Sequence, residues 1–234
     1  MPNELLLAAA VVVLYGAVLL WFRLFGETGL FAFTVFATIA ANIEVLILVD
    51  AFGMEMTLGN ILFATTFLVT DILSETHGKK SAQKAVHLGI LTSALFILVS
   101  QSWLLYTPAA SDWVSPAMRG VFANTPRMML ASLAVYAAAQ VFDVWLYHKW
   151  WALTAAKSGD SRKFLWLRNN GSTLISQLLN AVLFTLFAFY GAYGFRTLLS
   201  IALSSYVIFI ATSLLDTPAV YLARRIHERK TRKA

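Results

Sequence analysis

The sequence contains no cysteine and few charged residues. Without cysteine there is no disulfide framework, no thiol nucleophile and no thiolate metal ligand. Charged residues make up 13% of the 234 residues, about half the share in soluble domains, whereas hydrophobic residues make up 59%. No polar stretch is long enough to form a separate soluble domain. The composition therefore predicts a single transmembrane domain over residues 1–234.

Sequence signatures of membrane hydrolases and metalloenzymes are also missing. There is no His-Glu-x-x-His pair and no Gly-x-Ser-x-Gly turn. His77 and His87 flank a lysine-rich turn, too close to the predicted membrane surface and too poorly partnered for a metal site. We therefore expect a protein that is not an enzyme, with no catalytic residues, no metal and no cofactor.

Apolar segments of membrane-spanning length recur along the whole chain. A bilayer core takes about 20 apolar residues in helical form. On that scale the candidate spans are residues 4–22, 28–49, 59–76, 82–105, 127–148, 171–193 and 197–222. The span at 59–76 is the shortest and most polar, so it could be tilted, broken or re-entrant. The sequence thus predicts an all-α, polytopic membrane helical bundle with six to seven transmembrane helices.

Basic residues gather in alternate connecting segments. With seven spans, one side of the membrane carries 15 of the 18 Lys and Arg residues, Arg168 among them. By the positive-inside rule this side is cytoplasmic. The C-terminus is then cytoplasmic, with a basic tail at 228–234, and the N-terminus is outside. The net charge of +6 is explained by topology and by contact with anionic lipid headgroups, so we expect no nucleic-acid partner.

Polar and aromatic side chains recur at helical spacing inside four of the predicted spans. A carboxylate in the centre of a membrane costs about 2.5–3.5 kcal/mol on insertion scales, so such residues indicate functional sites. Steps of three or four residues place each set on one helix face. The four sets are Asn60, Phe63, Phe67, Asp71 and Glu75; Ser132, Tyr136, Gln140, Asp143 and Tyr147; Thr173, Gln177, Asn180 and Phe184; and Ser205, Phe209, Thr212 and Asp216.

Three of the acids lie at a similar depth. Asp71, Asp143 and Asp216 come 8, 6 and 8 residues before a basic segment, and Asn180 comes 12 residues after Arg168, which places all four roughly 9–18 Å from the basic ends. A layer of this kind suits a planar heterocycle, because carboxylates accept paired N–H groups, amides meet carbonyls and aromatic rings stack. The alternative is that the polar groups only hydrogen-bond neighbouring helices. The residues alone predict a pocket for a small polar solute, neutral or cationic.

Four ordered segments resemble a known family. Residues 59–89, 125–150, 165–184 and 213–226 carry motifs such as TD-x-x-SE-x-x-GKK and Q-x-x-DV. Over about residues 30–226 the chain resembles the bacterial queuosine precursor transporter family, also called the vitamin uptake transporter family. The resemblance implies import of 7-cyano-7-deazaguanine (preQ0) and 7-aminomethyl-7-deazaguanine (preQ1) across the inner membrane of a bacterium. The resemblance leaves open whether the protein forms a homodimer. It also leaves open a second function, in which the chain is the substrate-binding subunit of an energy-coupled vitamin importer.

The stripes and the resemblance together predict a set of substrate-binding residues. Asp143 with Gln140, or Asp71 with Glu75, would take the guanidine-like edge of the solute, while aromatic rings stack on its face. The full set is Phe63, Phe67, Asp71, Glu75, Tyr136, Gln140, Asp143, Asn169, Asn170, Ser176, Gln177, Asn180 and Asp216.

Two positions depart from the family pattern. Asn180-Ala181 stands where the family has Asp-Thr, and Phe209 stands where it has Lys. We interpret this as the loss of a buried acid–lysine pair as one unit, because losing a single partner would cost about 3–5 kcal/mol.

Overall fold

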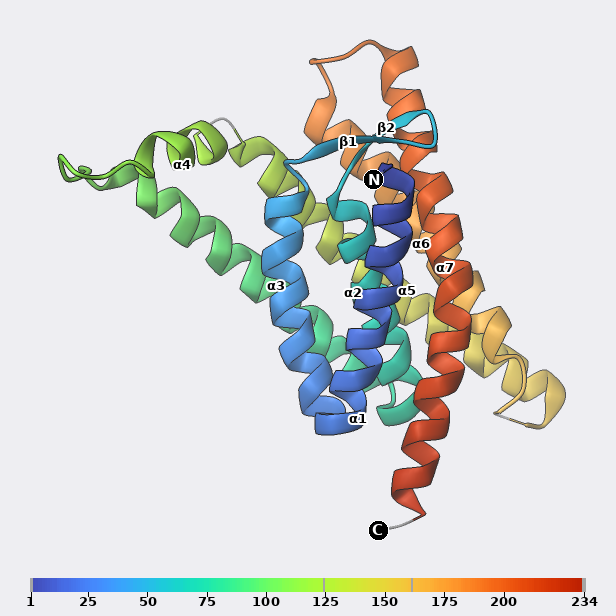
Figure 1. Ribbon diagram of the computed structural model, residues 1–234. Coiled ribbons are helices and arrows are strands. Elements are labelled where there is room, and N and C mark those ends of the chain that lie inside the picture. Colours follow the sequence, from blue (N-terminus) through green and yellow to red (C-terminus); the bar gives the residue numbers. More distant parts are fainter. Residues whose placement is uncertain (1, 124, 161, 233–234) are drawn as a thin grey trace.

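The computed structural model describes residues 2–123, 125–160 and 162–232. Within them the chain is almost entirely helical (Figure 1). The exceptions are a short hairpin of β1 (Leu48–Ala51) and β2 (Met54–Thr57), a 3-10 turn (Trp103–Leu105) and the loops that connect the helices. The helices are α1 (Asn3–Glu44), α2 (Gly59–His77), α3 (Lys79–Ser102), α4 (Ser115–Phe122), α5 (Pro126–Ser158), α6 (Leu165–Phe189) and α7 (Phe195–Thr231). The prediction of an all-α membrane bundle is confirmed.

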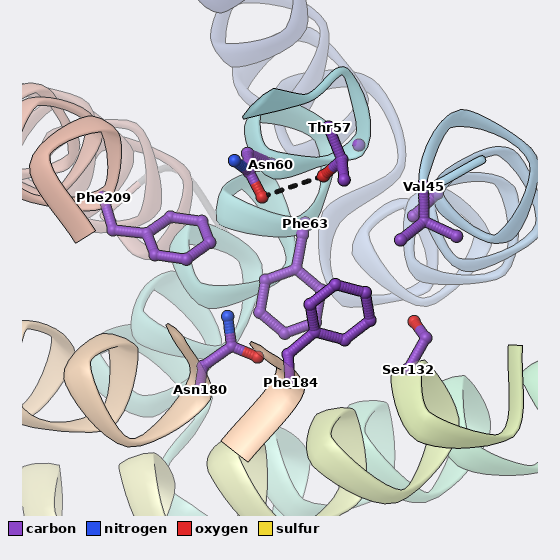
Figure 2. Close-up of a pocket in the computed structure, with 10 residues that line it drawn as sticks. Val45, Thr57, Asn60, Phe63, Ser132, Asn180, Phe184 and Phe209 are labelled. Carbon is purple, nitrogen blue, oxygen red and sulfur yellow. Dashed lines mark hydrogen bonds between the residues drawn. The ribbon is translucent and has the colours of Figure 1, made fainter. Parts of the chain in front are cut away.

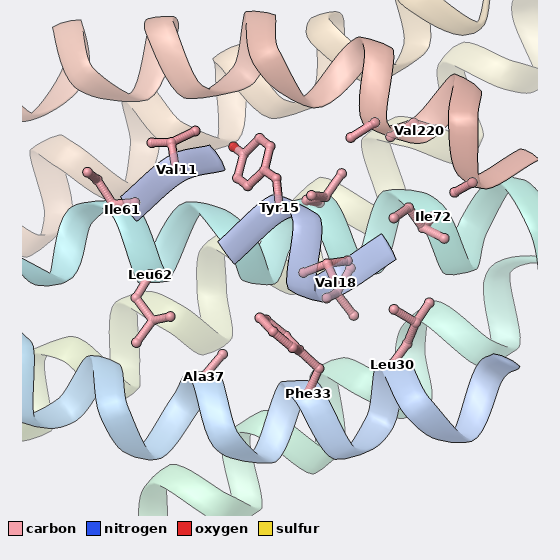
Figure 3. Close-up of a cluster of buried hydrophobic side chains, with 14 of the residues drawn as sticks. Val11, Tyr15, Val18, Leu30, Phe33, Ala37, Ile61, Leu62, Ile72 and Val220 are labelled. Atoms are coloured by element: carbon pink, nitrogen blue, oxygen red, sulfur yellow. The ribbon is translucent and has the colours of Figure 1, made fainter. Parts of the chain in front are cut away.

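Helix α1 folds back on itself at Gly26 and so supplies the first two predicted spans. Gly26 has φ +62° and ψ −139°, a conformation that residues with a side chain rarely adopt. The two legs then run side by side, and Val18 of the first leg meets Leu30 and Phe33 of the second in the apolar core (Figure 3). The Trp21 and Phe33 rings lie 6.4 Å apart.

The second leg ends at Glu44, not at residue 49 as predicted. The chain there forms the β-hairpin, with Asp50 paired to Glu55 across the strands. Its turn has positive φ at Phe52 and Gly53, as two-residue hairpin turns require. The N-terminus is attached to the same hairpin, because Asn3 Nδ2 donates to the Asp50 carbonyl at 2.8 Å. Hydropathy alone could not distinguish this apolar hairpin from the end of a helix.

Helix α2 occupies the centre of the bundle. Of its 19 residues 15 are buried, and it packs against α1, α3, α5 and α7. Five helices of the described chain are long and apolar enough to cross a membrane, namely α1, α3 with its 3-10 extension, α5, α6 and α7. Helix α2 is more polar because its neighbours cover it and it needs no surface for lipid. With both legs of α1 counted, seven helical segments run between the two ends of the bundle.

The two ends of the bundle differ in their connections. The N-terminus and the β-hairpin lie at one end, which we call the hairpin end (Figure 1). The Gly26 turn, the α2–α3 turn, the α5–α6 connection and the end of α7 lie at the other, which we call the basic end (Figure 1). Arg162 in the α5–α6 connection is 3.5 Å from Glu228 of α7. The basic segments therefore share one end in space, as their alternation along the sequence predicted.

The α7 helix continues through most of the predicted basic tail. It runs to Thr231, so the tail at 228–234 is a continuation of the last spanning helix for the part that the structure describes. Residues 233 and 234 lie outside the described range. Helix α4 leans away from the bundle with the end of α3 (Figure 1), and the segment before it exposes Leu105 and Trp113, each 85% accessible. Such apolar exposure is typical of a surface in contact with lipid.

Candidate functional site

A cavity lies just inside the hairpin end, between α1, α2, α5, α6 and α7. The space between its walls is about 360 Å³, open solvent included. Figure 2 shows the side chains that converge on it. The wall is made by Ala41, Val45, Thr57, Gly59, Asn60, Phe63, Ser132, Asn180, Phe184 and Phe209.

Aromatic rings dominate this cavity. Phe63 of α2 lies at its centre, with ring centroids 5.9 Å from Tyr136 and 6.2 Å from Phe209. Phe184 of α6 projects toward Phe63 from the opposite wall (Figure 2). Phe67, one turn further along α2, packs against Phe63 with ring centroids 5.4 Å apart. These rings give the cavity an aromatic wall on which a planar ring can stack.

Two amides supply the polar edges of the cavity. Asn60 Oδ1 accepts a hydrogen bond from Thr57 at 3.1 Å (Figure 2), which fixes its orientation. Asn180 of α6 faces the cavity with its amide (Figure 2). Phe209 lines the same cavity from α7, so the two departures from the family pattern face one space. Of the predicted site residues, Phe63 and Asn180 line this cavity.

A smaller hollow of about 240 Å³ adjoins the cavity and shares Phe63 and Ser132 with it. Tyr136, another predicted site residue, lines this hollow. Its ring has room there because residue 89 is glycine: a Cβ at Gly89 would stand 2.0 Å from the Tyr136 hydroxyl. The position of Tyr136 thus depends on a close approach of α3 and α5.

Three carboxylates from three helices form a layer beyond Phe67, which we call the acid layer. Asp71 of α2, Asp143 of α5 and Asp216 of α7 are each at most 1% exposed, and Asp71 lies within electrostatic range of the other two. Thr173 of α6 donates to Asp71 Oδ2 at 3.1 Å. All three acids are thus buried inside the bundle, and their contact with a solute stays a prediction.

The acid layer is short of hydrogen-bond donors and cations. Among the described residues no partner exists for Asp71 Oδ1, for either oxygen of Asp143 or for Asp216 Oδ1. The ion pairs between described residues do not include these three acids. Buried polar atoms are almost always paired in folded proteins, and an unpaired one costs about 1–3 kcal/mol. The layer therefore has unused capacity to accept hydrogen bonds.

Helix α6 adds uncharged polar groups to the acid layer. Ser176 lies beside the Asp143 carboxyl, yet its hydroxyl has no partner among the described residues. The same holds for both polar atoms of the Gln177 amide and for Asn169 Oδ1. Asn169 Nδ2 reaches only Thr217, at 3.4 Å. These groups offer donors and acceptors in the place where the carboxylates lack them.

Glu75, one turn beyond Asp71, has a very different environment. Its carboxylate accepts hydrogen bonds from Arg168 at 2.7 Å and from Tyr147 at 3.0 Å, and it pairs with Arg224 at 3.1 Å. Trp151 covers the Arg168 guanidinium at 4.3 Å. We call Glu75, Tyr147, Arg168 and Arg224 the ion cluster. Because every partner site of Glu75 is occupied, its carboxylate is not free to receive a solute.

Arg168 was assigned from the sequence to a basic loop, and this assignment is wrong. Helix α6 begins at Leu165, not at residue 171, and the Arg168 side chain is fully buried. The run Arg168-Asn169-Asn170 lowers local hydropathy, which placed the start of the span too late. No sequence signal identified its partner, because Glu75 lies 93 residues away along the chain.

Gln140 and Asn170 are engaged with neighbouring helices. Gln140 Nε2 donates to Thr66 at 2.6 Å, and its Oε1 accepts from Thr70 at 3.3 Å, so both ends of the amide join α5 to α2. Asn170 Nδ2 donates to Thr217 at 2.6 Å. These bonds match the alternative that was weighed for the polar stripes, interhelical hydrogen bonding.

Within the described ranges no three acidic or imidazole side chains group closely enough to hold a metal ion. Residues 57–223, which include the acid layer, most of the cavity wall and the ion cluster except Arg224, match the model of a family described as putative vitamin uptake transporter. The chain belongs to this family. Membership in this transporter family implies solute movement rather than catalysis.

A curated relative of this family member carries a more specific name. The probable queuosine precursor transporter of Bacillus subtilis (strain 168) is 40% identical to the chain over 209 residues, which cover 89% of each protein. No solved structure matches the chain significantly.

Proposed function

We propose that this family member imports queuosine precursors, the deazaguanines preQ0 and preQ1, across the cytoplasmic membrane of a bacterium. The name of the 40% identical relative supports the solute class. The observation that carries the proposal is the acid layer, in which buried carboxylates have oxygen atoms without partners. A deazaguanine offers adjacent ring and exocyclic N–H groups on one edge, and a carboxylate with two free oxygens accepts such a pair.

In the proposed path the solute first enters the cavity at the hairpin end. Its ring stacks on the face of Phe63 or Phe184, while Asn60 and Asn180 hydrogen-bond its edges. In this proposal the cavity widens to admit the neutral ring system that preQ0 and preQ1 share. Tyr136 and Phe67 border the stacking site on its inner side.

The solute then moves to the acid layer, where Asp143 takes the guanidine-like edge. Asp143 is our choice because both its oxygens lack partners and because Ser176 lies beside it. Gln177 and Asn169 supply the remaining polar contacts, and Asp71 and Asp216 complete the layer. Glu75, Gln140 and Asn170 are left out of the solute contacts, since their hydrogen-bonding groups are held by neighbouring helices.

The charge distribution gives the direction of access. If the basic end is cytoplasmic, as the positive-inside rule requires, the cavity opens toward the outside and the C-terminus is inside. The ion cluster lies between the acid layer and the cytoplasm and closes the inner side. Alternating exposure of a central site is the usual mechanism of such carriers.

The test is solute binding to the purified protein, with Asp143→Asn as the key variant. Loss of a charge-assisted hydrogen bond of about 1.5–3 kcal/mol should weaken preQ0 binding by about tenfold or more in isothermal calorimetry. The fold should be preserved, because Asn has the size of Asp. Asp50→Asn in the β-hairpin is the matched control and should bind normally. Unchanged affinity in Asp143→Asn would remove Asp143 from the site, and no binding of any deazaguanine to the wild type would overturn the function.

A further inference from the structure

A second hollow lies on the outer surface of the bundle, between the first leg of α1 and α7 near the basic end. The space between its walls is about 1210 Å³, open solvent included. Gly16 and Leu19 of α1 and Leu222 and Ile226 of α7 form its apolar part. We call it the α1–α7 groove. It belongs neither to the cavity nor to the acid layer.

The floor of the groove is open at Gly16. No atom lies within 4 Å of the place where a Cβ on Gly16 would stand. Beside it, Leu20 and Leu222 are 49% and 47% exposed. In a chain that spans a membrane, an open apolar groove at this depth faces hydrocarbon. Its occupant must therefore be a molecule with a long apolar part.

The end of the groove nearest the basic end is positively charged. Arg23 of α1 stands on one wall and Arg229 and Lys230 of α7 stand on the other, and all three are exposed. The ion pairs between described residues include none of them, and the lining of the groove contains no acid. Three uncompensated cations at the rim of an apolar groove are complementary to an anionic headgroup on acyl chains.

We propose that the α1–α7 groove is a binding site for an anionic phospholipid. One acyl chain lies over Gly16 between α1 and α7. The phosphate lies between Arg23 and the Arg229–Lys230 pair, where a guanidinium can bind two phosphate oxygens at once. A zwitterionic lipid would fill the apolar part equally well, but its headgroup would gain less binding free energy at the cationic rim. The site therefore selects for headgroup charge.

Native mass spectrometry of the purified protein tests this proposal directly. The protein is mixed with dioleoyl-phosphatidylglycerol, with dioleoyl-phosphatidylcholine, or with inorganic phosphate alone. Basic residues near an anionic surface contribute about 1 kcal/mol each, so phosphatidylglycerol should bind at least about tenfold more tightly than phosphatidylcholine. Equal retention of the two lipids would overturn the proposal, as would displacement of the lipid by inorganic phosphate, which would indicate a plain anion site.

Two kinds of variant separate the headgroup contact from the chain contact. Arg23→Gln and Arg229→Gln should each reduce phosphatidylglycerol binding by about fivefold and leave phosphatidylcholine unchanged. Gly16→Leu fills the floor and should weaken both lipids, and it should fold because the space there is empty.

Matched controls exist for both kinds of variant. Gly120 is also a helical glycine with nothing within 4 Å of its Cβ position, but it lies in α4, far from the groove. Arg196 is an exposed arginine near the start of α7. Gly120→Leu and Arg196→Gln should retain both lipids at wild-type levels, and a loss as large as in the groove variants would overturn the site. The measurement needs no transport, so it stands apart from the proposed solute.

Discussion

Asp71 and Glu75 lie one turn apart on the same face of α2, and they differ in almost every contact. Glu75 has two arginines and a tyrosine hydroxyl around its carboxylate. Asp71 has one threonine hydroxyl and faces two further acids. Both are buried, so burial does not distinguish them. What distinguishes them is whether their oxygens are already bound, and by that measure Glu75 holds the fold together while Asp71 is available for a ligand.

The largest effect should come from breaking the ion cluster. Glu75→Gln leaves the fully buried Arg168 without its charge partner, which costs about 3–5 kcal/mol. We expect a large drop in the midpoint of thermal unfolding in detergent. The same change one turn away, Asp71→Asn, should leave stability within about 1 kcal/mol, because it removes no ion pair. Equal losses in the two variants would refute the contrast drawn between these acids.

The next effect concerns the two departures from the family pattern. Asn180 and Phe209 line the same cavity (Figure 2), so Asn180→Asp and Phe209→Lys should each introduce one unpaired charge there. An unpaired charge in a fully buried position costs about 3–5 kcal/mol. Because the cavity admits water, each single variant should lose less stability than that. The double variant should recover most of the stability that the singles lose. Additive losses in a double-mutant cycle would show that the pair does not act as a unit.

A smaller effect tests the aromatic side of the site. Gly89→Ala places a methyl group against Tyr136 and should cost about 1–3 kcal/mol, as overpacking does. It should also weaken solute binding by moving the tyrosine ring. Gly120→Ala, with open space at its Cβ, is the control and should change neither stability nor binding. In a Tyr136→Ala background, Gly89→Ala should not change stability. A loss of stability that persists in that background would show that the effect comes from another contact.

The orientation can be tested with almost no perturbation of the fold. The chain has no cysteine, so a single introduced cysteine is labelled without background. A membrane-impermeant maleimide on intact spheroplasts should label Ser111→Cys near the hairpin end. It should label Thr231→Cys at the end of α7 only after the cells are opened. The reverse pattern would invert the proposed topology and with it the side on which the solute enters.

Much of the fold followed from apolar length and charge alternation. Apolar runs identified both legs of α1, and the basic segments predicted which connections share an end. The central position of α2 was not predictable, because its low hydropathy results from neighbours that belong to distant parts of the sequence. The hairpin at 48–57 was missed for a related reason, since a short apolar strand and the end of an apolar helix have the same composition.

The candidate site was predictable in depth but not in pairing. Counting residues from the basic ends placed Asp71, Asp143 and Asp216 at one level, and all three are buried in the structure. Sequence spacing could not show that Glu75 would be neutralised, because Arg168 appeared to belong to a loop. Nor could it show that Thr66 and Thr70 would occupy the Gln140 amide. Such pairings depend on the rotation of each helix about its axis.

The sharing of one carboxylate among several helices has a consequence for movement. Tyr147, Arg168 and Arg224 come from α5, α6 and α7, and all three hold the same Glu75 of α2. Neither α6 nor α7 can leave α2 at the basic end alone without separating an arginine from Glu75 in a dry interior, and α5 would leave the Tyr147 hydroxyl without its acceptor. The helices can separate at the basic end only when water enters between them and hydrates all the charged groups at once. Inward release of a solute would then be a concerted, wetting-dependent event, with few partly open states between the closed and open forms.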